Sequence, residues 1–318
     1  MVYCLWQKNR MEKSRTEVHF DMEFKKIELT DREWMEPLLA ASGYQGCDYS
    51  FGNLDIWKDL YRQQAAEAGG MLCIRSRKPG TGEYMYLFPA GNGSLQEAVC
   101  FMMEDAERLG VPFLMRGFAA EEADRLTEAF PDTFVTESVR AEWDYLYRVE
   151  DLTLLAGKKY HGKRNHIARF EESGDWHFEP LCVNNIEACR KMCRTWYGEH
   201  AAGGNMMALA DRGVVDNALL YFDKLGFTGG VLYQCGQVVG FTVGEPLNQD
   251  TYVVHIEKAF AEIQGAYPVI NREYVKHMMQ GYVYVNREED DGIAGLRKAK
   301  ESYHPVMLEK FAARRISV

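Results

Sequence analysis

The sequence predicts an α+β fold in which two similar units each contain a mixed sheet with flanking helices. Strands paired as a hairpin, then a glycine turn, a helix and a further strand follow one another in this order twice along the chain. The segments Gly110–Arg116 and Gly281–Arg287 occupy the same place in the two halves, after a helical pattern, and both end in arginine. This agreement indicates an internal duplication.

In the first half, Met71–Arg75 and Glu83–Phe88 alternate about the turn-like sequence Lys78-Pro79-Gly80, which is typical of two paired strands. A helical pattern then runs from Leu95 to Leu109, and Gly110 is a suitable stop for it. The pattern further predicts a strand over Val111–Met115, a helix over Ala119–Phe130 and extended chain over Phe134–Tyr147.

The second half repeats this order after two predicted helices, Tyr160–Phe170 and Ile186–His200. The predicted elements that follow are a hairpin of Gly230–Gln234 and Val238–Val243, a strand over Thr251–Ile256, a helix from Gly265 to Met279 and a strand over Tyr282–Val285. A boundary near Val149–Asp151 divides the chain into an N-terminal tail (1–21), an N-terminal domain (22–149) and a C-terminal domain (150–318). The length of 318 residues suits two domains of about 150 residues each.

Composition narrows the class of protein. The chain is 47% hydrophobic and 26% charged, which is typical of a globular protein. A net charge of -10 argues against a protein that coats nucleic acid with its whole surface. No stretch approaches the roughly 20 apolar residues that span a bilayer, so we expect no transmembrane segment and a cytoplasmic location.

The eight cysteines are scattered. None forms a Cys-x-x-Cys pair, and Cys189 and Cys193 have no second pair or nearby histidine to complete a tetrahedral site. We therefore expect free thiols in a reducing compartment, and neither a metal site nor a disulfide.

One segment opposes the acidic trend. Gly157–Phe170 (GKKYHGKRNHIARF) holds five lysines and arginines and two histidines without a carboxylate. Such a cluster attracts phosphate, although a solvated basic helix start would have the same composition. A second basic segment, Leu296–Pro305, lies near the C-terminus and is expected to form an opposite wall.

The segments GKKYHGKRNHIARF at 157–170 and NREEDDGIAGLRKAKESYHP at 286–305, together with YSFGNLDIW at 49–57, carry a resemblance to a known family. From Met22 onward the chain resembles the bacterial family that shares the C-terminal domain of phosphatidylglycerol lysyltransferase. That family resembles tandem GNAT acyltransferase domains and is similar to the aminoacyl-tRNA-dependent Fem transferases.

This resemblance implies an acyl- or aminoacyltransferase. The donor would be an aminoacyl-tRNA or an acyl-CoA, with no tightly bound cofactor, and the acceptor an amine or hydroxyl on a small molecule, lipid or peptide. Two alternatives stay open: a non-catalytic module that senses a phosphorylated ligand, and a peripheral enzyme that modifies lipid head groups. Transmembrane helices, which lipid lysyltransferases have, are missing from this sequence, and this weakens the case for a lipid acceptor.

The candidate catalytic residues are His255, Glu257 and Tyr303. Strand alternation would place His255 and Glu257 on one face of a central strand. Burying a polar side chain there costs free energy unless the side chain is hydrogen-bonded or has a functional role. We expect His255 to be the general base and Glu257 to orient it, while a core histidine satisfied by one hydrogen bond is the alternative. The GNAT resemblance implies that Tyr303 protonates the leaving group.

The candidate donor-binding residues lie in three places. The turn Gln264-Gly265-Ala266 opens a helix whose free N–H groups could hold phosphate. Arg297 and Lys300 share a helix face and could clamp an anion. The remaining candidates are Lys163, Arg164 and His166 in the basic segment and Asn286, which could bond an amide-like arm of the donor.

Two further expectations concern the acidic run that follows Arg287 and the first half of the chain. The acidic run Glu288–Asp291 is expected to be a solvated loop, or else a site for a cationic acceptor. The first half lacks counterparts to the basic residues, so we expect it to be a scaffold or to bind the acceptor.

Overall fold

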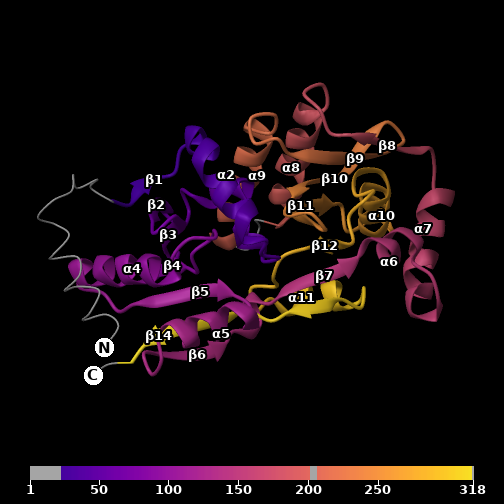
Figure 1. Cartoon of the computed structure of the whole chain (residues 1–318). Coiled ribbons are helices and arrows are strands. Elements are labelled where there is room, and N and C mark those ends of the chain that lie inside the picture. The colour runs from indigo at the N-terminus through magenta and orange to yellow at the C-terminus, as the bar shows by residue number, and fades with distance from the viewer. Residues whose placement is uncertain (1–22, 201–205, 317–318) are drawn as a thin grey trace, which may run out of the picture. The chain divides into compact units, whose positions relative to one another are not determined.

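The computed structural model describes residues 23–200 and 206–316 (Figure 1). These residues form two compact units. The first ends at Glu142 and also includes the C-terminal segment from Glu309, and the second is the continuous stretch Trp143–Leu308. The tail expected at 1–21 lies outside the described residues.

The first unit contains a sheet in the strand order β1-β2-β3-β4-β5-β14-β6. The strands β4 and β5 are parallel, and the other described neighbours are antiparallel. Its strands are β1 (Lys25–Lys26), β2 (Gln64–Ala68), β3 (Met71–Arg77), β4 (Tyr84–Leu87), β5 (Leu114–Phe118), β6 (Phe134–Ser138) and β14 (Phe311–Arg315). Its helices are α2 (Arg32–Ser42), α3 (Phe51–Trp57), α4 (Leu95–Leu109) and α5 (Ala120–Ala129).

The second unit contains a sheet in the order β13-β7-β12-β11-β10-β9-β8, and here β11 and β12 are the parallel pair of the described strands. Its strands are β7 (Asp144–Arg148), β8 (Trp176–Pro180), β9 (Thr228–Gln234), β10 (Gln237–Pro246), β11 (Thr251–Ala259), β12 (Tyr284–Asn286) and β13 (Val306–Leu308). Its helices are α6 (Val149–Leu154), α7 (His161–Glu172), α8 (Ile186–His200), α9 (Met206–Leu220), α10 (Ala266–Met278) and α11 (Ala294–Glu301).

The two sheets have the same topology, in agreement with the predicted duplication. Read from β1 and from β8, the strands match one for one, and each sheet has its parallel step at the same place, bridged by α4 or α10. The sixth position of each sheet is filled by a strand from the far side of a boundary: β7 follows β6 but joins the second sheet, and β14 follows β13 but joins the first. The duplicated units have therefore exchanged one strand each.

This exchange corrects the predicted domain limits. The division lies between Glu142 and Trp143, so β7 belongs to the second unit, and residues from Glu309 onward return to the first unit. A strand's residues specify which face is buried, but they do not specify which sheet it joins.

Most predicted elements are confirmed within a few residues, and α4 shows why. Ser94 accepts a hydrogen bond from the Glu97 amide at its start, and Gly110 ends it with a left-handed φ of 67°. The strand expected at Val111–Met115 begins later, at Leu114, because the Val111 amide still closes the helix end by donating to Ala106.

Each unit has its own hydrophobic core, and aromatic rings are prominent in both. In the core of the second unit the fully buried rings include Tyr145, Tyr160, Phe170, Tyr252 and, on α10, Tyr274. No helix among the described residues is both long and apolar enough to cross a membrane.

Candidate active site

At the parallel step between β11 and β12 of the second sheet, the two strands part toward their carboxyl ends. The two strands pair only from Thr251 to Val253, opposite Tyr284 to Asn286. Beyond Asn286 the chain no longer pairs with β11, whereas β11 continues to Ala259 alongside β10. Ligands of open α/β sheets bind at such carboxyl ends, so the side chains here are the first to consider.

Glu257 and Arg287 meet at this place. Arg287 Nη2 donates to Glu257 Oε1 over 2.7 Å, and Glu257 Oε2 accepts from Asn271 of α10 over 2.9 Å. The guanidinium carbon lies 5.5 Å from the ring centroid of Tyr147 and 5.2 Å from that of Tyr303. We call Tyr147, Lys163, Glu257, Arg287 and Tyr303 the Tyr303 cluster.

Lys163 joins the Tyr303 cluster from α7. Its Nζ lies 3.7 Å from the ring centroid of Tyr303 and donates to Ser302 Oγ over 2.6 Å. Burial and the charge of Arg287 lower the pKa of Lys163 to about 8, against the opposing effect of Glu257. The two basic segments therefore meet through Lys163 and the residues that follow α11.

Tyr303 itself is 5% exposed, and its carbonyl oxygen accepts a hydrogen bond of 2.9 Å from the Tyr160 hydroxyl. Burial raises the pKa of the Tyr303 phenol well above its ordinary value, so it stays protonated at neutral pH. No described residue hydrogen-bonds its hydroxyl. The group can therefore donate a proton to a ligand without first breaking an internal bond.

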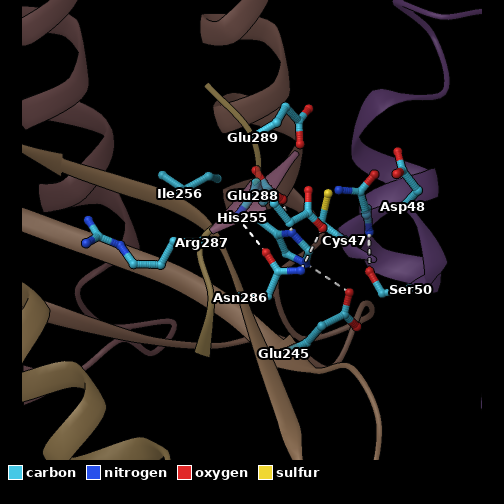
Figure 2. Close-up of polar contacts among 12 residues, drawn as sticks. Cys47, Asp48, Ser50, Glu245, His255, Ile256, Asn286, Arg287, Glu288 and Glu289 are labelled. Atoms are coloured by element: carbon cyan, nitrogen blue, oxygen red, sulfur yellow. Dashed lines mark hydrogen bonds and ion pairs between the residues drawn. The ribbon is translucent and has the colours of Figure 1, made fainter. Parts of the chain in front are cut away.

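His255 lies in a different environment. Its imidazole is fully buried, with Nδ1 2.8 Å from Glu288 Oε1 and Nε2 3.0 Å from Glu245 Oε1 (Figure 2). Burial alone would lower the pKa of His255, but the hydrogen bonds to these two carboxylates raise it to about 9. Figure 2 shows that Arg287 extends away from this group.

The predicted His255–Glu257 pair is therefore wrong. The register of β10 against β11 shifts at His255, which has no counterpart on β10, and this β-bulge reverses the alternation of faces. As a result Glu257 faces α10, while its neighbour Lys258 donates to Asp211 of α9. Both His255 nitrogens are bonded to carboxylates and its pKa is raised, which favours the imidazolium over the neutral imidazole that a general base requires.

The other basic residues of α7 do not join Lys163. Arg164 Nη1 donates to the carbonyl oxygens of Leu155 and Gly157, so it fastens the loop before the helix. His166 has an exposed side chain, whereas Ile167 and Phe170 of the same helix are buried.

The predicted phosphate cradle at Gln264-Gly265-Ala266 is covered. A Cβ atom on Gly265 would lie 2.2 Å from the carbonyl oxygen of His166, so the glycine allows α7 to approach closely. The Ala266 amide already donates to Ile263, and Pro268 has no N–H to offer. The start of α10 is therefore poorly suited to hold a pyrophosphate.

The predicted clamp of Arg297 and Lys300 is also occupied. Arg297 forms a two-pronged contact of 2.8 and 2.8 Å with Asp290, and Lys300 Nζ donates to the carbonyl oxygens of Arg287 and Glu289. Asp290 is fully buried; burial alone would raise its pKa, but hydrogen bonds from Arg297 and Tyr145 hold that pKa well below its usual range. The acidic run is thus a structured turn, not a solvated loop.

Asn286, like Arg297 and Lys300, is held by hydrogen bonds within the protein. It is fully buried, donates to Asp144 over 2.7 Å and accepts from the Glu288 amide over 2.7 Å. It fixes the turn after β12 and is not placed to meet the arm of a donor.

Known proteins show the family to which this chain belongs. The family model for the C-terminal region of phosphatidylglycerol lysyltransferase matches residues 40–314. The chain belongs to this family. None of the curated proteins matches it.

Solved structures of other proteins are similar to this chain. A conserved protein of unknown function from Bacteroides thetaiotaomicron is 37% identical, with a TM-score of 0.85 over 93% of this chain and 100% of that one. The L-PGS structure from Bacillus licheniformis is 19% identical, with a TM-score of 0.62 over 90% and 92% of the two chains. FemX is 9% identical, with a TM-score of 0.58 over 92% and 97%. The fold is accordingly α+β with tandem GNAT-like units, as predicted.

The prediction missed Glu245 and Arg287 of this lysyltransferase-family unit, and it named Glu288 only as part of the acidic run Glu288–Asp291. A signal existed for Arg287, because it ends the segment that aligns with Gly110–Arg116. Arg116 also pairs with a glutamate, Glu142, in the first unit. No local pattern pointed to Glu245, or to Glu288 as a partner of His255, since the bulge that aims His255 toward them depends on strand register.

Proposed function

We propose that the protein is a transferase that moves an aminoacyl or acyl group from an activated ester to an amine or hydroxyl acceptor, and that the Tyr303 cluster is its reaction site. The observation that carries this proposal is the convergence of Lys163, Glu257, Arg287 and Tyr303 where β11 and β12 part. Family membership supports the same reaction class.

Tyr303 suits the role of general acid. The acceptor nitrogen bonds to the carbonyl carbon, the bond from that carbon to the leaving oxygen breaks, and the leaving oxygen takes the phenol proton. The tyrosine then regains the proton that the attacking amine releases. Lys163 and Arg287 place positive charge beside Tyr303, which favours the binding of an anionic group of a substrate there.

We propose aminoacyl-tRNA as the donor. The covered turn at Gly265 offers little to the pyrophosphate of an acyl-CoA. The exposed side chains of Lys158 and Arg169 lie at the two ends of the same basic segment and suit contacts to a nucleic-acid backbone.

The donor is tested by incubating the protein with mixed aminoacyl-tRNA or with acetyl-CoA. Each reaction contains free amino acids, short peptides and phospholipid vesicles as acceptors, and mass spectrometry follows the products. Product from aminoacyl-tRNA alone supports the proposal, product from acetyl-CoA alone refutes the donor, and no product from either refutes the transferase.

A binding measurement adds a second test. Affinity for tRNA should fall steeply with salt, and Arg169→Met should reduce the slope of log K against log salt by about one. An unchanged slope would mean that this face of α7 does not meet the nucleic acid.

A further inference from the structure

The guanidinium of Arg287 is buried, and one of its nitrogens lacks a hydrogen-bond partner. The side chain is 12% exposed, and Nη2 is satisfied by Glu257. The Nη1 atom is buried without an acceptor among the described residues. Buried polar groups are nearly always satisfied, so a charged donor left unpaired in this position requires an explanation.

A second cation lies against the same tyrosine. The Lys163 Nζ and the Arg287 guanidinium carbon are 3.7 and 5.2 Å from the ring centroid of Tyr303. Among the described residues Glu257 is the carboxylate that pairs with this group, and its ion pair is with Arg287. Two cations and one carboxylate leave the cluster with a net charge of +1 while Lys163 is protonated.

We infer that Lys163 and Arg287 bind a small carboxylate, one oxygen of which accepts from Arg287 Nη1. A monoanion brings the cluster to neutrality, whereas a phosphate dianion would leave a net negative charge in a buried place. The Nη1 atom can donate a charge-assisted hydrogen bond to a carboxylate oxygen, and the rings of Tyr147 and Tyr303 lie 5.5 and 5.2 Å from the guanidinium carbon.

This site restricts the acceptor, a step that rests on the proposed function. The carboxyl group of an aminoacyl donor is esterified, so a free carboxylate at Arg287 belongs to the acceptor. The acceptor class is then a free amino acid or a short peptide, and a phospholipid head group that bears only phosphate does not fit.

The binding step is tested without any turnover. Thermal unfolding of the full chain is followed during titration with sodium acetate or sodium phosphate, with sodium chloride holding the ionic strength constant. We expect a saturable rise in Tm with acetate. Lys163→Met should weaken this binding at least tenfold, and the matched control Lys159→Met, in the same basic segment, should leave it unchanged.

Arg287→Lys keeps a charge for Glu257 but removes the free nitrogen, and it should also weaken acetate binding at least tenfold. If that variant does not fold, Lys163→Met and its control Lys159→Met still test whether the carboxylate site exists. The inference is overturned if acetate raises Tm no more than chloride does, or if phosphate raises Tm more than acetate. It is also overturned if Lys159→Met weakens acetate binding as much as Lys163→Met does. Acetate binding without transfer would refute the proposed transferase function but support the carboxylate site. Transfer without acetate binding would support the transferase function but refute the carboxylate site.

Discussion

Gly265 and His166 pack so closely that a Cβ atom on the glycine would lie 2.2 Å from the histidine's carbonyl oxygen. The contact joins the turn before α10 to the backbone of α7, the helix that carries Lys163. It explains in one step why the turn needs glycine and why phosphate has little access to it.

Gly265→Ala should therefore destabilise the protein by about 2–5 kcal/mol, the sum of overpacking and of strain at a φ of 90°. Denaturant unfolding measures the change. The matched control is Gly281→Ala, where φ is 97° but no atom lies within 4 Å of the added carbon, so only the strain of about 1 kcal/mol remains. Equal losses in the two variants would show that the α7 contact is not tight.

His255 should make stability depend on pH. Its pKa is raised from 6.5 to about 9, so its contribution is complete below pH 6.5 and is lost as pH rises through 9. His255→Gln should remove that dependence and cost on the order of 3 kcal/mol at neutral pH. The free energy of unfolding, measured between pH 6 and 10, tests this.

His277→Gln serves as control, since His277 is half exposed on α10. It should keep the pH dependence of the wild type. If His255→Gln instead left the pH profile of stability unchanged and abolished an activity that follows a pKa near 6.5, the general-base role would be restored.

The fold could be predicted further than the site. Helix caps and strand patterns are local, so α4, α10 and the hairpin of β9 and β10 were placed within a few residues. The duplication could be predicted for the same reason, because it shows in the order of local elements. The exchange of β7 and β14 could not be predicted, because tertiary packing determines which strands pair.

The site illustrates the same limit. Lys163 and Tyr303 were both named, and they do meet, although 140 positions separate them in the sequence. Arg164, Arg297, Lys300 and Asn286 have the right chemistry for ligands, but the chain's own carbonyls and carboxylates bind them. Residue type alone cannot distinguish a side chain that binds a ligand from one that fastens a loop.

Tyr303→Phe should lower kcat by about 10²–10⁴-fold, because it removes the proposed proton donor, and it should barely change Tm. The rate is measured with whichever donor is consumed. Tyr160→Phe is the contrasting variant: its hydroxyl holds the Tyr303 carbonyl, so its loss should lower Tm by a few degrees and affect kcat less. A fully active Tyr303→Phe enzyme would remove the tyrosine from the mechanism.

The exchanged strand makes an asymmetric prediction about fragments. The second unit is continuous from Trp143 to Leu308, so that fragment should fold alone. A fragment of residues 23–142 lacks β14, which pairs with both β5 and β6 and buries Ala313 in the core. It should remain unfolded by circular dichroism until a peptide of residues 309–318 is added. The same peptide with Ala313→Asp should not restore folding, because it would bury an unpaired charge. A 23–142 fragment that folds without any peptide would show that β14 is dispensable to the first sheet.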